Sequence, residues 1–162
     1  MADLTVTLTE SFTLNGREHG GSKAVNIGAC TEVMKRTVTC KSSADTIVAF
    51  FDDTPADTAS AVDIQGTKYF RLTNLDAQYV TVSLWIDIAE DSSAEDTMCS
   101  FKLAPNQSWI FGTMHDSFAV DDDTDGGGLG VLTDFDDIIK VSVKPSSGTA
   151  LVEVFTAGTR TS

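Results

Sequence analysis

One stretch of this sequence carries residue types that could bind a metal ion: AVDDDTDGGGLGVL, from Ala119 to Leu132. Asp121, Asp123 and Asp125 alternate before a glycine, which matches D-x-D-x-D-G, the first half of an EF-hand-type calcium loop. In such a loop the alternate carboxylates converge on a hard cation, and the glycine permits a sharp turn. The twelfth position departs from the pattern, because it is Leu132 instead of a bidentate glutamate. We therefore expect a hydrated turn first and a structural calcium site second, with no cofactor required.

A second candidate site comes from two alternating segments, KYFRLTN and YVTVSLWIDI. Each has one apolar row that faces a core and an opposite row that faces outward. The outward rows include four residues that suit an interface, namely Tyr69, Arg71, Trp85 and Asp87. If the segments pair as a hairpin around Asp76–Gln78, Tyr69 lies opposite Trp85, and the two rings form a platform for a partner or a sugar. The alternative is a local aromatic pair covered by a loop of the same chain.

The sequence contains no catalytic signature. It has no G-x-S-x-G elbow, H-E-x-x-H motif, phosphate loop or dinucleotide fingerprint. Its histidines are His19 and His115, and the neighbours of His115 alternate in direction along the chain, so they cannot form a triad. We expect a protein that is not an enzyme and has no catalytic residues.

The charge is strongly acidic and unevenly distributed. A net charge of -13 argues against nucleic acid and anionic membranes as partners, and favours solubility. Residues 85–137 contain thirteen acids and one base, whereas residues 1–44 contain four acids and five bases. These bases are Arg17, Lys23, Lys35, Arg36 and Lys41, and they are candidates for a basic face that orients the molecule on a larger surface.

Cysteine usage and the first residues bear on the compartment. Cys30, Cys40 and Cys99 are odd in number and lack metal-site spacing, so we expect small buried hydrophobes in a chain made in a reducing cytoplasm. MADLTVTLTE has neither a basic start nor a long apolar run, and we expect no targeting or membrane segment.

The elements that must position these residues are strands. LTVTLTESFTL places Leu4, Val6, Leu8, Phe12 and Leu14 on one face, which predicts a half-buried strand, with a break near Glu10 and a tight turn at Asn15-Gly16. Further strands are predicted at Lys23–Ile27, Glu32–Cys40, Thr46–Phe51, Lys68–Asn74, Tyr79–Ala89, Thr97–Leu103, Ser108–Phe111, Asp137–Lys144 and Ala150–Thr156. This pattern predicts one all-β domain over residues 1–162, an antiparallel β-sandwich or jelly-roll-like fold of about nine to ten short strands.

The phrasing of these segments resembles a known class of proteins. MADLTVTLTESFTLNG, KYFRLTNLD, VSLWIDI, FKLAPNQSWIFG and TALVEVFTAG are similar to small acidic virion proteins of tailed phages, especially marine and cyanobacterial ones. The resemblance implies a β-sandwich subunit of the particle, made in the host cytoplasm, and above all a capsid decoration or cement protein. Its partners would be the major capsid protein or other virion subunits, and further copies of itself. A tail or fibre component that binds host glycans and a calcium-dependent adhesion module are the alternatives.

Overall fold

The computed structural model describes residues 2–52, 61–86, 96–112, 119–120 and 136–159, and all of its regular elements are β-strands. The predicted all-β class is confirmed, and the strand segments, β1 to β14, outnumber the nine or ten expected. Within the described residues there is no helix long and apolar enough to cross a membrane.

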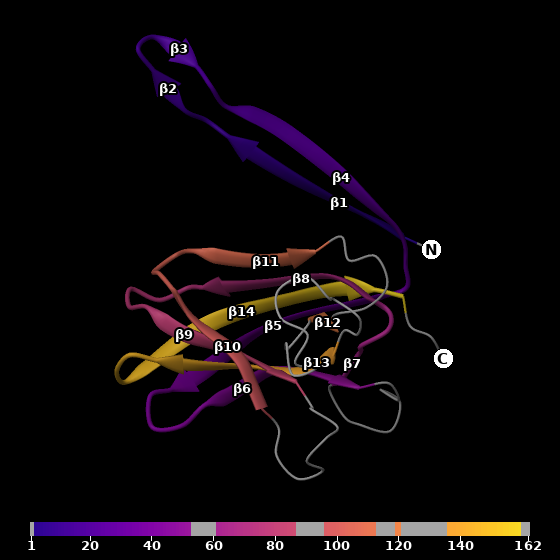
Figure 1. The fold of residues 1–162 in the computed structure, drawn as a ribbon, viewed down its shortest axis with the longest axis vertical. Helices are drawn as coiled ribbons and strands as arrows, with labels where there is room; N and C mark the ends of the chain where they lie inside the picture. The colour runs from indigo at the N-terminus through magenta and orange to yellow at the C-terminus, as the bar shows by residue number, and fades with distance from the viewer. Residues whose placement is uncertain (1, 53–60, 87–95, 113–118, 121–135, 160–162) are drawn as a thin grey trace, which may run out of the picture.

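Two sheets form the sandwich (Figure 1). Sheet I has the order β10-β9-β13-β6-β7, made by β10 (Asp96–Leu103), β9 (Val80–Ile86), β13 (Asp136–Pro145), β6 (Thr46–Asp52) and β7 (Val62–Asp63), and β12 (Ala119–Val120) also pairs with β13. Sheet II has the order β11-β8-β14-β5, made by β11 (Ser108–Gly112), β8 (Thr67–Asn74), β14 (Thr149–Gly158) and β5 (Glu32–Lys41). Every pairing is antiparallel except that between β6 and β7.

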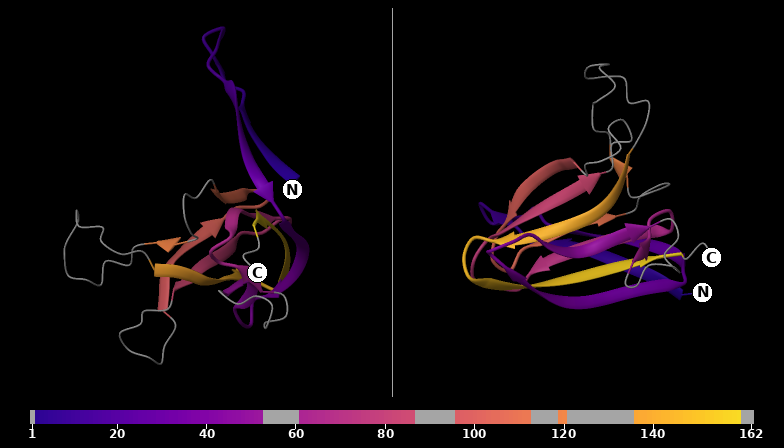
Figure 2. Two further views of the ribbon diagram at one scale, coloured as in Figure 1. Left: turned by 90° about the vertical axis from the view of Figure 1, so that its right-hand side faces the viewer. Right: turned by 90° about the horizontal axis from the view of Figure 1, so that it is seen from below.

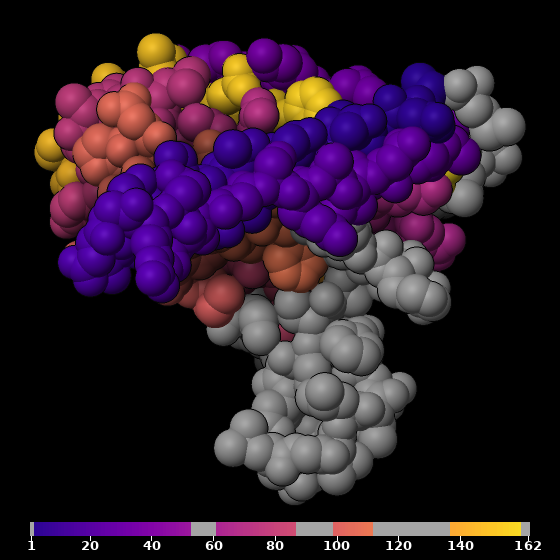
Figure 3. Space-filling model, turned by 90° about the horizontal axis from the view of Figure 1, so that it is seen from above, coloured from indigo at the N-terminus to yellow at the C-terminus, as the bar shows by residue number. Residues whose placement is uncertain are grey.

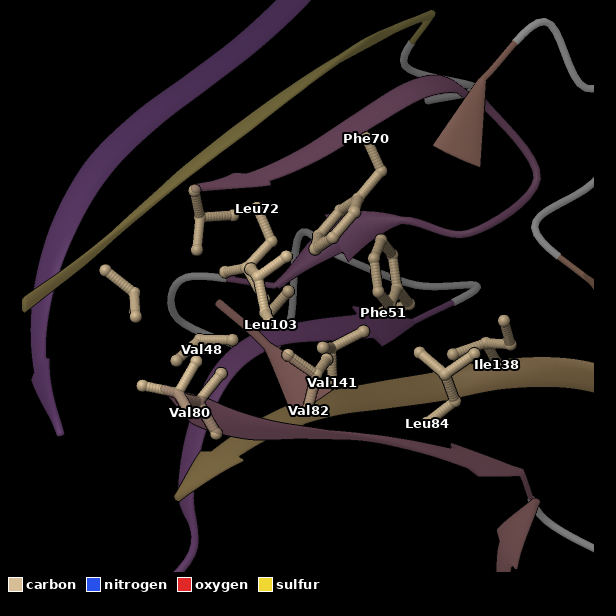
Figure 4. Close-up of a cluster of buried hydrophobic side chains, with 14 of the residues drawn as sticks. Val48, Phe51, Phe70, Leu72, Val80, Val82, Leu84, Leu103, Ile138 and Val141 are labelled. Atoms are coloured by element: carbon tan, nitrogen blue, oxygen red, sulfur yellow. The ribbon is translucent and has the colours of Figure 1, made fainter. Parts of the chain in front are cut away.

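The core lies between the sheets and follows the period-two rows of the sequence (Figure 4). Val80, Val82 and Leu84 point inward from β9, and they meet Phe70 and Leu72 of β8 on the opposite sheet. The inward rows predicted for both segments are therefore confirmed where the structure describes them. Because these rows are almost wholly removed from water, they supply the main apolar stabilisation of the sandwich.

Successive strands at one end of the sandwich change sheet instead of forming hairpins. The connections β5–β6, β8–β9, β10–β11 and β13–β14 each lead from one sheet to the other. The side chain of Asn74 joins two of them, because its amide donates to the carbonyl oxygens of Gln78 (2.7 Å), Leu103 (3.2 Å) and Ala104 (3.1 Å). Gln78 extends this network to a third connection by donating from Nε2 to the carbonyl oxygen of Thr149 at 2.8 Å.

The first thirty residues form a separate feature, a long β-hairpin that we call the arm (residues 2–30). It consists of β1 (Ala2–Glu10) paired with β4 (Gly21–Cys30), and of β2 (Thr13–Leu14) paired with β3 (Arg17–Glu18) at its tip. Neither pair joins the sheets of the sandwich. The arm crosses above sheet II and rises away from it toward its tip (Figures 1 and 2), and the view from above shows it lying across the body (Figure 3).

Candidate interaction surface: the N-terminal arm

Local sequence explains why the arm is a hairpin. The predicted break follows Glu10, where β1 ends, and the predicted turn is formed by Asn15 and Gly16, both with positive φ (52° and 74°). Such angles belong to the tight two-residue turns that match the twist of paired strands, and asparagine and glycine adopt them at low cost. The turn brings Leu14 opposite Arg17.

The tip of the arm is held together by one carboxylate. Glu18 accepts hydrogen bonds from the backbone N–H groups of Phe12 (3.0 Å) and Gly20 (2.8 Å) and from the Thr13 hydroxyl (3.0 Å). These bonds, that from Phe12 first, lower the pKa of Glu18, because they favour the ionised form. The His19 N–H donates to the carbonyl oxygen of Phe12 at 2.7 Å. The tip is therefore a defined structure that can present side chains in fixed positions.

The base of the arm packs on the outer face of sheet II. Ile27 is buried there against Tyr69, with Leu4, Val6 and Phe155 partly buried around them. The rings of Tyr69 and Phe155 meet edge to face, 5.8 Å between centroids, a geometry that aromatic pairs prefer. This second, smaller apolar cluster fixes the direction in which the arm leaves the sandwich.

Beyond the base, the same face of the arm is apolar and open to solvent. Strand alternation and register place Leu8 and Val25 on the face that carries Leu4, Val6 and Ile27. Four apolar side chains of the distal half are exposed, namely Leu8 (59%), Phe12 (56%), Leu14 (51%) and Val25 (37%). The prediction of a half-buried strand is thus right for the first residues of β1 and wrong beyond Val6, because no part of the described chain covers the distal half.

The predicted Tyr69–Trp85 platform does not form. β8 and β9 lie in different sheets, with β11 and β14 as the neighbours of β8 and β10 and β13 as those of β9. Tyr69 is 5% exposed and lies beneath the base of the arm. The physical reason is that two apolar rows can be buried by facing each other across a core as well as by lying side by side.

The environment of Trp85 is on the outer face of sheet I. Its indole Nε1 donates to the Ser142 hydroxyl at 2.7 Å, and the Lys140 ammonium lies 4.8 Å from its ring centroid. Burial lowers the pKa of Lys140, since desolvation disfavours its charged form. Trp85 is therefore packed against its own sheet, at a distance from the residues with which we expected it to act.

On sheet II the charged residues form a small network. The Arg71 guanidinium contacts the Glu153 carboxylate at 2.5 Å and lies 5.5 Å from the Phe155 ring centroid. Lys35 contacts the other oxygen of Glu153 at 3.2 Å, and this hydrogen bond is the first cause of a lowered Glu153 pKa. Arg71 is therefore held in place on the outer face of sheet II, between Ile110 of β11 and Phe155 of β14.

The five N-terminal bases are distributed over several surfaces. Arg17 and Lys23 lie on the arm, whereas Lys35 and Lys41 alternate with Arg36 along β5. The side chain of Arg36 turns to the other side of the strand and donates to the Val48 carbonyl oxygen through Nε (3.2 Å) and through a second nitrogen (2.5 Å). The described structure thus places Lys35 and Lys41 on the same outer face of sheet II, six residues apart along β5, and separates them from the others.

Two further predictions concern calcium and the thiols. Asp121, Asp123, Asp125 and Asp87 lie outside the described residues, and within the described ones no three His, Cys, Asp or Glu side chains gather as a metal site would require.

Cys30 and Cys40 are buried as expected, and burial raises the pKa of Cys40 to about 11. The expectation for Cys99 is wrong, because it is exposed on β10, next to an irregularity in the pairing with β9.

Sequence reasoning found the apolar row of the arm but missed that half of it lies at a surface. One signal was available: Leu8, Phe12 and Leu14 continue the row on both sides of the predicted break near Glu10 and up to the predicted turn, so the hairpin is too long to be covered by one small sheet.

Comparison with known proteins adds no relative: no family model, curated protein or solved structure matches this chain.

Proposed function

We propose that this protein is a non-enzymatic structural subunit of a tailed-phage virion, and in particular a capsid decoration or cement protein. The observation that carries the proposal is the arm, which extends a fixed apolar face from a well-packed sandwich. Exposed apolar side chains gathered on one surface are typical of protein interaction sites. The virion assignment comes from the resemblance of the strand and turn segments to small acidic phage proteins.

The proposed mechanism is adhesion without chemistry. The two sheets provide a rigid body, and the arm reaches over a neighbouring subunit and buries Leu8, Phe12 and Leu14 against it. Each of these side chains is already about half covered in the free chain, so burying the rest contributes about half of the 1.5–3 kcal/mol of a full burial, about 1 kcal/mol. Three per arm, repeated over many copies on a shell, give a large collective stabilisation. The acidic charge keeps the free subunit soluble before assembly.

The test is quantitative mass spectrometry of purified particles, which compares the copy number of this chain with that of the major shell protein. A copy number equal to that of the shell protein, or a simple fraction of it, is expected. A handful of copies per particle would assign the chain to the tail, and absence from particles would refute the virion role.

A matched pair of variants connects the copy number to the arm. Leu8→Glu/Phe12→Glu should reduce occupancy on particles, because each charge makes burial of the arm face costly. Ile47→Glu introduces one such glutamate at a residue of similar exposure (50%) on β6, and its occupancy should equal that of the unmodified chain.

A further inference from the structure

Two exposed apolar surfaces occur on the same molecule. The first is the distal face of the arm described above, and the second is the outer face of sheet II beyond the base of the arm. On that second face Ile110 of β11 is 48% exposed and Leu151 of β14 is 44% exposed. Since the base of the arm already packs on this sheet around Tyr69, the sheet has an established affinity for the apolar side of such a hairpin.

The charges on the two surfaces do not oppose their contact. Outward side chains of sheet II include Lys35, Lys41 and Arg71, with Glu153 as the acid among them. The arm contains three acids and two bases, and register and alternation place one of each, Glu10 and Lys23, on the face that carries Leu8. In a chain of net charge -13 these are surfaces through which two copies can meet without strong repulsion.

The area is sufficient for association when each copy both gives and receives an arm. The free part of the arm runs from Thr7 to the turn at Asn15, nine residues that span about 30 Å at about 3.3 Å per residue. One face of a two-stranded ribbon of this length, about 10 Å wide, offers about 300 Å². In a reciprocal dimer each copy buries about 300 Å² of its arm and about 300 Å² of its sheet, which is about 600 Å² per copy. The total for the two copies, about 1,200 Å², is at the lower limit of specific interfaces.

From these surfaces we infer that the arm of one molecule docks on the outer face of sheet II of a second copy of this chain. The arm's Leu8 and Phe12 then lie over the neighbour's Ile110 and Leu151. Reciprocal docking gives a dimer, and the same contact repeated around an axis gives a closed ring. This inference deepens the proposed function, since it makes a second copy the first partner of the arm.

Light scattering coupled to size-exclusion chromatography tests the inference on the full chain. The unmodified protein should elute as an oligomer, and Leu8→Glu/Phe12→Glu should reduce its mass to that of one chain, 17.3 kDa. Ile110→Glu/Leu151→Glu should do the same from the other side of the contact, while Ile47→Glu should leave the oligomer intact. Circular dichroism melting of each variant shows whether the sandwich remains folded, and only folded variants are compared.

Mixing the arm variant with the sheet variant distinguishes docking between copies from docking within one. Neither variant can form the contact alone, but a mixed pair retains one intact arm on one intact sheet. This pair keeps half of the contact area, so weak association that increases with concentration, and that neither variant shows alone, is expected in the mixture. A monomeric unmodified protein at its highest soluble concentration, an arm variant that remains oligomeric, or a mixture that stays monomeric would each overturn the inference.

These outcomes are independent of the particle measurement. Oligomers that are absent from particles would refute the virion role and retain the arm contact. A monomer that is abundant on particles would refute the arm contact between copies and retain the virion role.

Discussion

Replacing Tyr69 with alanine should release the arm while leaving the sandwich folded. Tyr69 lies on the outer face of sheet II and contacts Ile27, Phe155 and the first residues of the arm, with no role in the main core. Truncating a buried aromatic side chain costs about 3–5 kcal/mol. Since the arm has few other attachments, we expect most of this loss, about 3 kcal/mol, in the docking of the arm.

The magnitude can be read by hydrogen exchange. An isolated two-stranded hairpin is at best marginally stable in water, so an undocked arm should exchange rapidly. A docking loss of about 3 kcal/mol corresponds to about a 100-fold faster exchange of the β1 and β4 amides. The measurement should be made in the Leu8→Glu/Phe12→Glu background, so that contacts between copies do not protect the arm.

Trp85→Ala is the matched control, because it removes an aromatic side chain from the outer face of the other sheet. It loses the hydrogen bond to Ser142 and should destabilise the sandwich without changing arm exchange. The reasoning would be refuted if Tyr69→Ala left arm exchange unchanged. It would also be refuted if arm and sandwich amides accelerated together, since the arm would then not be a separate unit.

Three further predictions follow from buried or hydrogen-bonded groups. Asn74→Ala should cost about 3 kcal/mol, because the side chain no longer donates to the carbonyl oxygens of Gln78, Leu103 and Ala104. It should lower the melting temperature by about 10 °C, whereas Thr73→Ala should stay within about 0.5 kcal/mol. The pKa of Glu18 is lowered first by the hydrogen bond from the Phe12 amide. The stabilisation that the Glu18 carboxylate gives to the tip is therefore present above the ordinary glutamate pKa and is lost as the pH falls through the lowered pKa. NMR of the Phe12 amide should follow this loss, and a Glu18→Gln variant whose Phe12 amide titrated identically would contradict the prediction. A thiol reagent should modify Cys99 in the native chain and the buried thiols only on unfolding, and Cys99→Ser should abolish the fast reaction.

The parts of the fold that alternation controls were predictable. A strand has only two faces, so an apolar row such as Val80–Ile86 determines which side is buried without any knowledge of its neighbours. The Asn15-Gly16 turn was predictable for an equally local reason, since few residue pairs adopt positive φ angles at low cost. These features depend on residues within a few positions of one another.

The pairing of strands was not predictable in the same way. The sequence predicts a hairpin turn after Asn74, yet this segment leads from sheet II to sheet I. The alternation of apolar residues is satisfied equally by a hairpin within one sheet and by a connection that crosses to the other sheet. The crossing is selected by a hydrogen-bond network between connections far apart in the sequence, in which the Asn74 amide donates to the carbonyl oxygens of Leu103 and Ala104 some thirty residues later. A hydrogen bond at that separation leaves no periodic trace in the sequence, so the Tyr69–Trp85 register could not be excluded before the structure was known.

The same distinction explains why the candidate site was recognised only in three dimensions. An exposed apolar row and a buried one have the same sequence pattern, because the pattern records the chemistry of a face and not what covers it. Leu4 and Leu8 occupy equivalent positions in β1, but only Leu4 packs on the sandwich, because Tyr69 and Phe155 cover the base of the arm alone. An apolar row that extends beyond the surface available within its own chain needs a second surface to cover it. A row of this kind on a hydrogen-bonded arm therefore favours association over folding within one chain, and the exposed apolar residues of the arm and of sheet II are the basis of the docking proposed above.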